Sequence, residues 1–138
     1  CKCFTKNLNT IHYFNMDTFN NAIKVMPCRN PYARIVSLYS YLKSTMPFKE
    51  FVQSYKEVAT MKFAPIYEYY MNDVIVIKQE KLQIDMKIKL GIKNIDVLNS
   101  SNRVTPWEHY YDDEAANIIY NDFQKDFDMF NYAKESYK

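Results

Sequence analysis

The pattern of hydrophobic and polar positions predicts two short strands separated by helices. Residues 22–26 are a nearly continuous apolar run, which is typical of a strand buried on both faces of a parallel sheet, and residues 74–77 give the clearest strand signal of the chain. Between them, apolar side chains recur at helical spacing from Pro31 to about Ser44 and again from Pro47 to Tyr55. A third, short helix rich in Tyr is expected at 63–70. Pro31 and Pro47 suit the first positions of their helices.

The second half of the chain predicts two further helices. Helical spacing returns over residues 80–90, and Gly91 is expected to end this helix. Residues 94–104 are expected to form a loop, and an acidic first turn at residues 112–114 begins a final helix that continues to Tyr132. Its Phe-rich stripe is expected to pack in the core. Strands that alternate with helices indicate an α/β protein with a mostly parallel sheet.

Length and composition place the chain among single-domain globular proteins. Its 138 residues are 48% hydrophobic and include 13 Tyr and 9 Phe, which argues against disorder and predicts one domain over residues 1–138. The net charge is +2 and no long basic run is present, so no nucleic-acid partner is expected. No apolar run approaches the length of a membrane span.

Cysteine and glycine usage excludes two kinds of site. Cys1, Cys3 and Cys28 lack the spacing and the partners of a zinc site, so no metal is expected and reduced thiols are the simpler interpretation. Gly91 is the only glycine, which excludes a Gly-rich phosphate loop within these residues.

The strongest chemical signal is the sequence Cys28-Arg29-Asn30-Pro31 between the first strand and the first helix. A helix N-terminus directs N–H groups at an anion, and an Arg side chain can bind a phosphate through two hydrogen bonds. Residues 29–39 closely resemble the 3'-phosphate-binding element of the carbohydrate-type, family 2-like sulfotransferases, Arg-(Asp/Asn)-Pro-(aromatic/Ile)-x-Arg-(Leu/Ile)-Val-Ser-x-Tyr. Further segments resemble motifs of this family in the same order: residues 48–52, 63–67, 74–82, 98–103 and 110–132.

The resemblance implies a three-layer P-loop-like fold, with a mostly parallel sheet flanked by helices. It implies transfer of a sulfuryl group from 3'-phosphoadenosine-5'-phosphosulfate (PAPS) to an acceptor hydroxyl, with a carbohydrate as the expected acceptor and no metal. Arg29 and Ser37 would hold the 3'-phosphate. Ser101 and Arg103 would close over the donor, and His12 would be the catalytic base, a task that suits its titration near neutral pH.

The chain departs from the family pattern at the loop that binds the 5'-phosphosulfate, Pro-Lys-x-(Gly/Ala)-x-Thr. Residues 2–5, Lys-Cys-Phe-Thr, are only a faint echo of it. Two interpretations follow: either the chain is truncated upstream, or it is a non-catalytic remnant that binds a nucleotide or a partner protein. The expected location is cytoplasmic, or the Golgi lumen if an N-terminal anchor is missing.

Several residues near the motifs allow a structural interpretation as well. Arg34 is expected to form an ion pair on the helix surface rather than to bind the donor. Glu80 could orient a site group or simply cap its own helix. Packing is favoured over a sugar-binding cleft for Tyr67, Tyr69 and Tyr70. Asn131 stands where the family usually has Gly.

Overall fold

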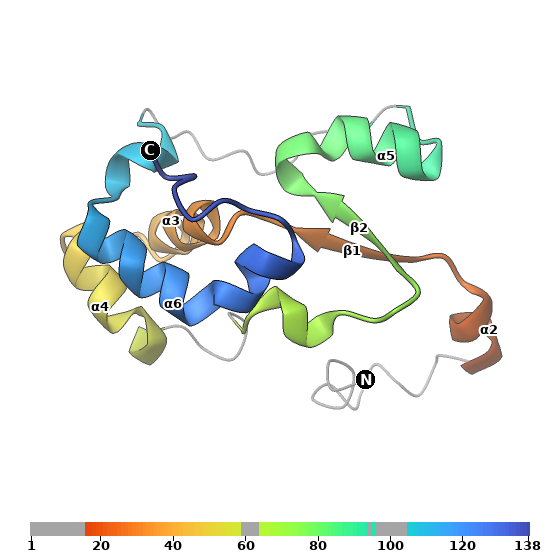
Figure 1. The fold of residues 1–138 in the computed structure, drawn as a ribbon, viewed down its shortest axis with the longest axis horizontal. Coiled ribbons are helices and arrows are strands. Elements are labelled where there is room, and N and C mark those ends of the chain that lie inside the picture. The colour runs from red at the N-terminus through yellow and green to blue at the C-terminus, as the bar shows by residue number, and fades with distance from the viewer. Residues whose placement is uncertain (1–15, 59–63, 94, 96–104) are drawn as a thin grey trace.

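The computed structural model describes residues 16–58, 64–93, 95 and 105–138 (Figure 1). It contains α-helices, β-strands and short 3-10 helices, which are labelled η. In chain order these are α2 (Met16–Asn21), β1 (Lys24–Cys28), α3 (Pro31–Tyr41), α4 (Phe48–Val58), η2 (Ile66–Tyr69), β2 (Val74–Lys78), η3 (Gln79–Lys81), α5 (Leu82–Leu90), η4 (Trp107–Tyr110) and α6 (Asp113–Met129).

The two strands pair in parallel, with Lys24 opposite Val74 and Cys28 opposite Lys78. The chain between them passes through α3, α4 and η2. In Figure 1, α3, α4 and α6 gather beyond the end of β1, while α5 lies along β2. The α/β class is therefore confirmed. Within the described residues the sheet has only these two strands, so the three-layer P-loop-like architecture remains a proposal.

The prediction for the first strand was wrong in its bounds and in its burial. The strand covers residues 24–28 rather than 22–26, and its side chains alternate between buried and exposed. Met26 and Cys28 are buried, but Val25 is 41% exposed. On the Val25 face of the sheet, Ile77 of β2 is 1% exposed, so the packing on this face buries β2 but does not extend over Val25 of β1. Pro27 is compatible with β1 because an edge strand has one side without a pairing partner.

The main core lies between α3, α4 and α6. Each helix contributes apolar side chains at the helical spacing read from the sequence. The fully packed members of this cluster are Tyr32, Ile35, Phe51, Val52, Tyr55, Ala115, Ala116, Ile119, Phe123 and Phe127. A smaller cluster of Met26, Cys28 and Phe130 lies on one face of the sheet. The predicted packing role of the Phe-rich stripe in the last helix is confirmed.

Helix ends follow the sequence signals closely. Gly91 ends α5 in the left-handed conformation, with φ of 70°, as predicted. Asp112 caps α6 by accepting a hydrogen bond from the backbone N–H of Ala115 at 2.8 Å. Asn131 also has a positive φ, 53°, which Asn tolerates better than most residues and which suits a position where the resembled motif has Gly.

Two further predicted elements, the helix at 63–70 and the loop at 94–104, are not confirmed. The Tyr-rich segment at 63–70 forms only a 3-10 turn, η2, instead of an α-helix. The expected loop at 94–104 lies outside the described residues except for Ile95.

One edge of β2 is closed by side chains of α5. The backbone N–H of Lys78 donates to Asp85 Oδ2 at 2.9 Å, and Lys89 Nζ donates to the carbonyl oxygen of Val76 at 2.8 Å. Asp85 and Lys89 also pair with each other at 3.0 Å. Because residues 76 and 78 present their backbone groups on the same side of the strand, α5 occupies the edge that a further strand would need.

This contact predicts a pH-dependent contribution to stability. The hydrogen bonds from Lys78 N–H and Lys89 lower the pKa of Asp85 below its ordinary value of 3.8. The contribution is therefore complete above that value and is lost as the pH falls through and below it. Asp85→Asn should unfold at lower urea concentration than the wild type at pH 7, and the difference should shrink below about pH 4. The exposed Asp128→Asn is the control; a difference for Asp85→Asn that stays constant to pH 3 would contradict this account.

Candidate anion-binding site

The candidate site lies where both strands end. Cys28 and Lys78 are register partners, so Arg29 and Glu80 follow neighbouring strand ends at the same edge of the sheet. Ligands of parallel α/β proteins commonly bind at this edge. Helix α3 begins directly after Asn30, which places Arg29 next to the N-terminus of a helix of 11 residues.

Asn30 holds the loop in one conformation because each of its polar groups is bonded. Its Oδ1 accepts the N–H of Tyr32 at 3.0 Å, and its carbonyl oxygen accepts the N–H of Arg34 at 2.9 Å. Its own N–H donates to Glu80 Oε1 at 2.7 Å, and its Nδ2 donates to Ser136 Oγ at 2.8 Å. Because Asn30 is only 5% exposed, these hydrogen bonds are shielded from water, and together they hold the backbone next to Arg29 in one conformation.

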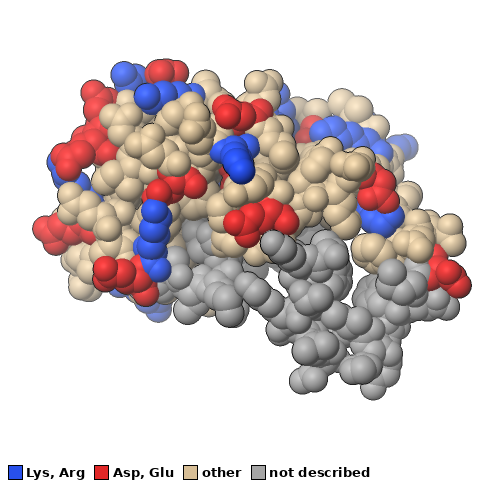
Figure 2. All heavy atoms as spheres, turned by 60° about the horizontal axis from the view of Figure 1, so that its bottom comes forward, with Lys and Arg blue, Asp and Glu red and all other residues tan. Residues whose placement is uncertain are grey.

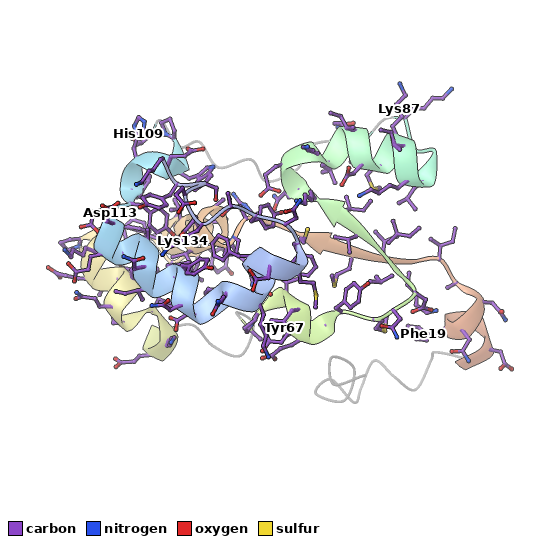
Figure 3. The ribbon with its side chains drawn as sticks, in the orientation of Figure 1. Phe19, Tyr67, Lys87, His109, Asp113 and Lys134 are labelled. Carbon is purple, nitrogen blue, oxygen red and sulfur yellow. The ribbon has the colours of Figure 1, made fainter. Side chains whose placement is uncertain are left out.

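The C-terminal segment crosses the same junction. Tyr132 donates its hydroxyl to Glu80 Oε2 at 2.9 Å and lies 3.6 Å from Cys28 Sγ. Tyr32 donates its hydroxyl to the carbonyl oxygen of Lys134 at 2.8 Å, and Figure 3 shows the segment at Lys134 beside α6. Three parts of the chain that are distant in sequence therefore meet at the Arg29 loop.

Burial keeps the thiol and the phenol at this junction neutral. It raises the pKa of Cys28, and it raises the pKa of Tyr132 well above 10. A neutral, buried thiol is a poor nucleophile. Cys28 and Tyr132 therefore support the loop and are not candidates for covalent catalysis.

Of the five predicted site residues, the structure describes Arg29 and Ser37. Arg29 is half-buried in the connection between β1 and α3, and Ser37 is half-buried two turns into the same helix. Helix α3 thus carries Ser37 and has Arg29 directly before its N-terminus, and the phosphate-binding role of the two residues stays a prediction. His12, Ser101 and Arg103 lie outside the described residues.

Arg34 has a different place from the one expected. Its ion pair was expected on the helix surface, but the side chain is only 16% exposed and lies 3.7 Å from the fully buried Asp126. Nη2 donates to the carbonyl oxygen of Ala64 at 2.7 Å. The surface interpretation is wrong because the segment before η2 and helix α6 both cover this side of α3. Arg34 serves the fold rather than a ligand.

The structure decides between the open interpretations of two other positions. Glu80 accepts the backbone N–H of Asn30, and no side chain caps the N-terminus of η3 or α5, so the capping interpretation is wrong. Tyr67 and Tyr69 pack against the small core cluster, as expected, whereas Tyr70 is 40% exposed. Tyr67 is labelled in Figure 3, where it lies on η2 below the sheet.

Sequence reasoning gave no role to Asn30, Tyr132 or Ser136, which complete the junction. Asn30 carried a usable signal, because Asn before Pro is a common helix cap. Tyr132 lies in a recognised motif, but its contact with Glu80 joins residues 52 positions apart. The bond from Asn30 to Ser136 spans 106 positions and has no local signal.

The remaining surface gives few hints of other chemistry. On the face shown in Figure 2, acidic and basic side chains are interspersed rather than separated. Among the described residues, no group of three or more His, Cys, Asp or Glu could hold a metal ion. None of the helices in the described part of the chain is long and apolar enough to cross a bilayer.

Comparison of the chain with protein-family models, with curated proteins and with solved structures found no match. The assignment of function therefore depends on the residues of the Arg29 loop and their geometry.

Proposed function

We propose that the chain is a sulfotransferase domain that binds the 3'-phosphate of PAPS at the junction of β1 and α3. The observation that supports the proposal is the strand–Arg29–helix arrangement, with the N-terminus of α3 held in place by Asn30. The N–H groups of Asn30, Tyr32 and Arg34 are already bonded within the protein, so the guanidinium of Arg29 and the positive end of the α3 dipole would attract the phosphate. The resemblance of residues 29–39 to the phosphate-binding motif selects this nucleotide among other phosphates.

Sulfuryl transfer is an in-line displacement at sulfur. The acceptor oxygen forms a bond to sulfur while the bond from sulfur to the bridging oxygen breaks, and 3'-phosphoadenosine-5'-phosphate leaves. Arg29 and Ser37 would bind the 3'-phosphate and thereby fix the orientation of the donor. His12 would take the proton of the acceptor hydroxyl, and Ser101 and Arg103 would enclose the donor. The expected acceptor is a carbohydrate hydroxyl.

The second candidate function is nucleotide binding without transfer. It is favoured by one feature of the sequence: its 138 residues contain no clear copy of the family's Lys loop, which would stabilise charge on the bridging oxygen. Both candidates share the 3'-phosphate site. A transfer assay with sulfur-labelled PAPS and polysaccharide acceptors separates them, because only the first predicts labelled product.

The shared site is tested by calorimetry with 3'-phosphoadenosine-5'-phosphate. Arg29→Ala removes a charge-assisted interaction worth about 1.5–3 kcal/mol, so the nucleotide should bind roughly 10- to 100-fold more weakly than it binds the wild type. Adenosine 5'-monophosphate, which lacks the 3'-phosphate, should bind the wild type more weakly by a similar factor and should be insensitive to the substitution.

Lys87→Ala provides the matched control, since Lys87 is an exposed cation on α5 (Figure 3). It should leave the affinity unchanged. Equal binding of the nucleotide by the wild type and Arg29→Ala would exclude the proposed site. Equal affinity for the two nucleotides would exclude the role of the 3'-phosphate.

A further inference from the structure

We propose that Glu80 is a positioning residue that sets the conformation of the Arg29 loop and thereby the affinity of the anion site. Its consequence for the nucleotide rests on the proposed function, whereas its effect on the loop does not. Glu80 follows β2 rather than β1, so it acts from outside the phosphate-binding motif. The sequence leaves open whether Glu80 orients a site group or caps its own helix, and it does not identify the group that Glu80 contacts.

Both carboxylate oxygens of Glu80 are used, and each bonds to a different part of the chain. Oε1 accepts the backbone N–H of Asn30 at 2.7 Å, and Oε2 accepts the hydroxyl of Tyr132 at 2.9 Å. The N–H of Asn30 belongs to the peptide unit that joins it to Arg29. The carboxylate therefore fixes the peptide plane directly after Arg29, and with it the direction in which that side chain leaves the backbone.

Because Glu80 is exposed, a substitution at this position can change the Arg29 loop without unfolding the protein. Glu80 is an exposed residue, unlike Asn30 and Tyr32 beside it, so its truncation leaves no cavity in the core. A variant at this position should therefore fold. The main loss is the restraint on the peptide between Arg29 and Asn30.

The negative charge of Glu80 is expected to weaken anion binding, whereas its hydrogen bond to Asn30 is expected to strengthen it. A carboxylate beside a helix N-terminus opposes the binding of a second anion there. Glu80→Gln keeps an oxygen that can accept the Asn30 N–H but removes the negative charge. Glu80→Ala removes both. The two variants therefore separate the restraint from the charge.

Glu80→Ala and Glu80→Gln are expected to change the affinity for the nucleotide differently. Glu80→Ala should bind 3'-phosphoadenosine-5'-phosphate about fivefold to tenfold more weakly than Glu80→Gln, because both variants lose the charge but only Glu80→Ala loses the restraint of roughly 1 kcal/mol. Glu80→Gln should bind it as tightly as the wild type or more tightly. Glu57→Ala, a change of an exposed Glu on α4, should alter nothing and is the matched control.

A spectroscopic signature tests the loop without any nucleotide. In a proton–nitrogen correlation spectrum, the amide signal of Asn30 should move upfield in Glu80→Ala, because its N–H loses a short bond to a carboxylate. The signals of Arg29 and Tyr32 should shift with it. In Glu80→Gln the Asn30 signal should stay closer to its wild-type position, and in Glu57→Ala it should not move.

The outcomes distinguish this inference from the proposed function. If the wild type fails to bind the nucleotide while Glu80→Ala still displaces the Asn30 signal, the proposed function is lost and the positioning of the loop is supported. If the Asn30 signal stays in place in Glu80→Ala, the positioning role is overturned. Equal affinity of Glu80→Ala and Glu80→Gln for the nucleotide would overturn it equally.

Discussion

Replacing Asp126 with alanine is expected to lower the free energy of unfolding by about 3–5 kcal/mol, since it leaves a buried guanidinium without its counter-charge. Asp126 lies in α6 and its side chain is fully buried. Arg34 of α3 lies 3.7 Å away, and its own side chain is mostly buried. Removing the carboxylate therefore takes away the acidic partner that lies 3.7 Å from this mostly buried guanidinium.

The substitution also removes the acceptor of two backbone hydrogen bonds. Asp126 Oδ2 accepts the N–H of Ile66 at 2.8 Å, and Oδ1 accepts the N–H of Tyr67 at 2.7 Å. Burial raises the pKa of Asp126, while these N–H groups and Arg34 oppose that rise. The carboxylate thus ties η2 and α3 to α6, and its loss frees all three attachments together.

Urea unfolding followed by circular dichroism measures the expected loss. The matched control is Asp128→Ala, two residues further along the same helix, where the side chain is exposed. Its effect should stay within about 0.5 kcal/mol, the range of ordinary surface changes. An Asp126→Ala variant within 1 kcal/mol of the wild type would show that the ion pair and the two N–H bonds contribute little to stability.

The helices were predictable because their signals are local. Pro31 and Asn30 mark the start of α3, Gly91 marks the end of α5, and the spacing of Phe123 and Phe127 identifies the buried face of α6. Each signal operates within one or two turns of the residue that carries it. The second strand was equally clear, since four successive β-branched residues precede Lys78.

Burial of the first strand was not predictable from its own residues. An apolar run indicates a strand that can be covered on both faces, but coverage depends on which other elements pack there. Here Met26 and Cys28 belong to the small core cluster, while Val25 stays 41% exposed. The sheet edge behaves similarly: Asp85 and Lys89 close it with side chains, an arrangement that hydrophobic periodicity does not encode.

The candidate site was predictable in its motif but not in its supports. Arg29 and Ser37 lie eight residues apart in one continuous segment, so one local motif is enough to predict both as site residues. Their supports come from Glu80, Tyr132 and Ser136, which reach the loop from distant parts of the chain. Arg34 also lies within the motif, but its side chain forms a buried ion pair with Asp126 instead of the surface ion pair expected from the sequence.

The aromatic anchor beneath the Arg29 loop predicts the second large effect. Tyr32 is fully buried in the first turn of α3, and its ring lies 4.9 Å from the rings of both Phe127 and Tyr111 and 5.4 Å from that of Tyr137. These edge-to-face contacts join α3 to α6, to the end of η4 and to the C-terminal segment. Because burial area and aromatic geometry both contribute, this ring is a main support of the site.

Tyr32→Ala should lower the free energy of unfolding by about 3–5 kcal/mol, the usual range for removing a large aromatic side chain from a core. Tyr32→Phe is the matched variant, because it keeps the ring and removes only the hydroxyl that donates to the carbonyl oxygen of Lys134. It should cost about 1 kcal/mol. Both variants are compared with the wild type by urea unfolding.

Tyr32→Ala and Tyr32→Phe also test whether the buried ring affects nucleotide binding at the Arg29 loop. Tyr32 follows Asn30 by two residues, and its backbone N–H is capped by that side chain. Loss of the ring should therefore loosen the first turn of α3, so Tyr32→Ala should bind 3'-phosphoadenosine-5'-phosphate more weakly even at temperatures where it remains folded. Tyr32→Phe should retain wild-type affinity because the ring still holds the turn. Wild-type affinity in folded Tyr32→Ala would mean that Asn30 and Glu80 fix the Arg29 loop without the aromatic cluster beneath it.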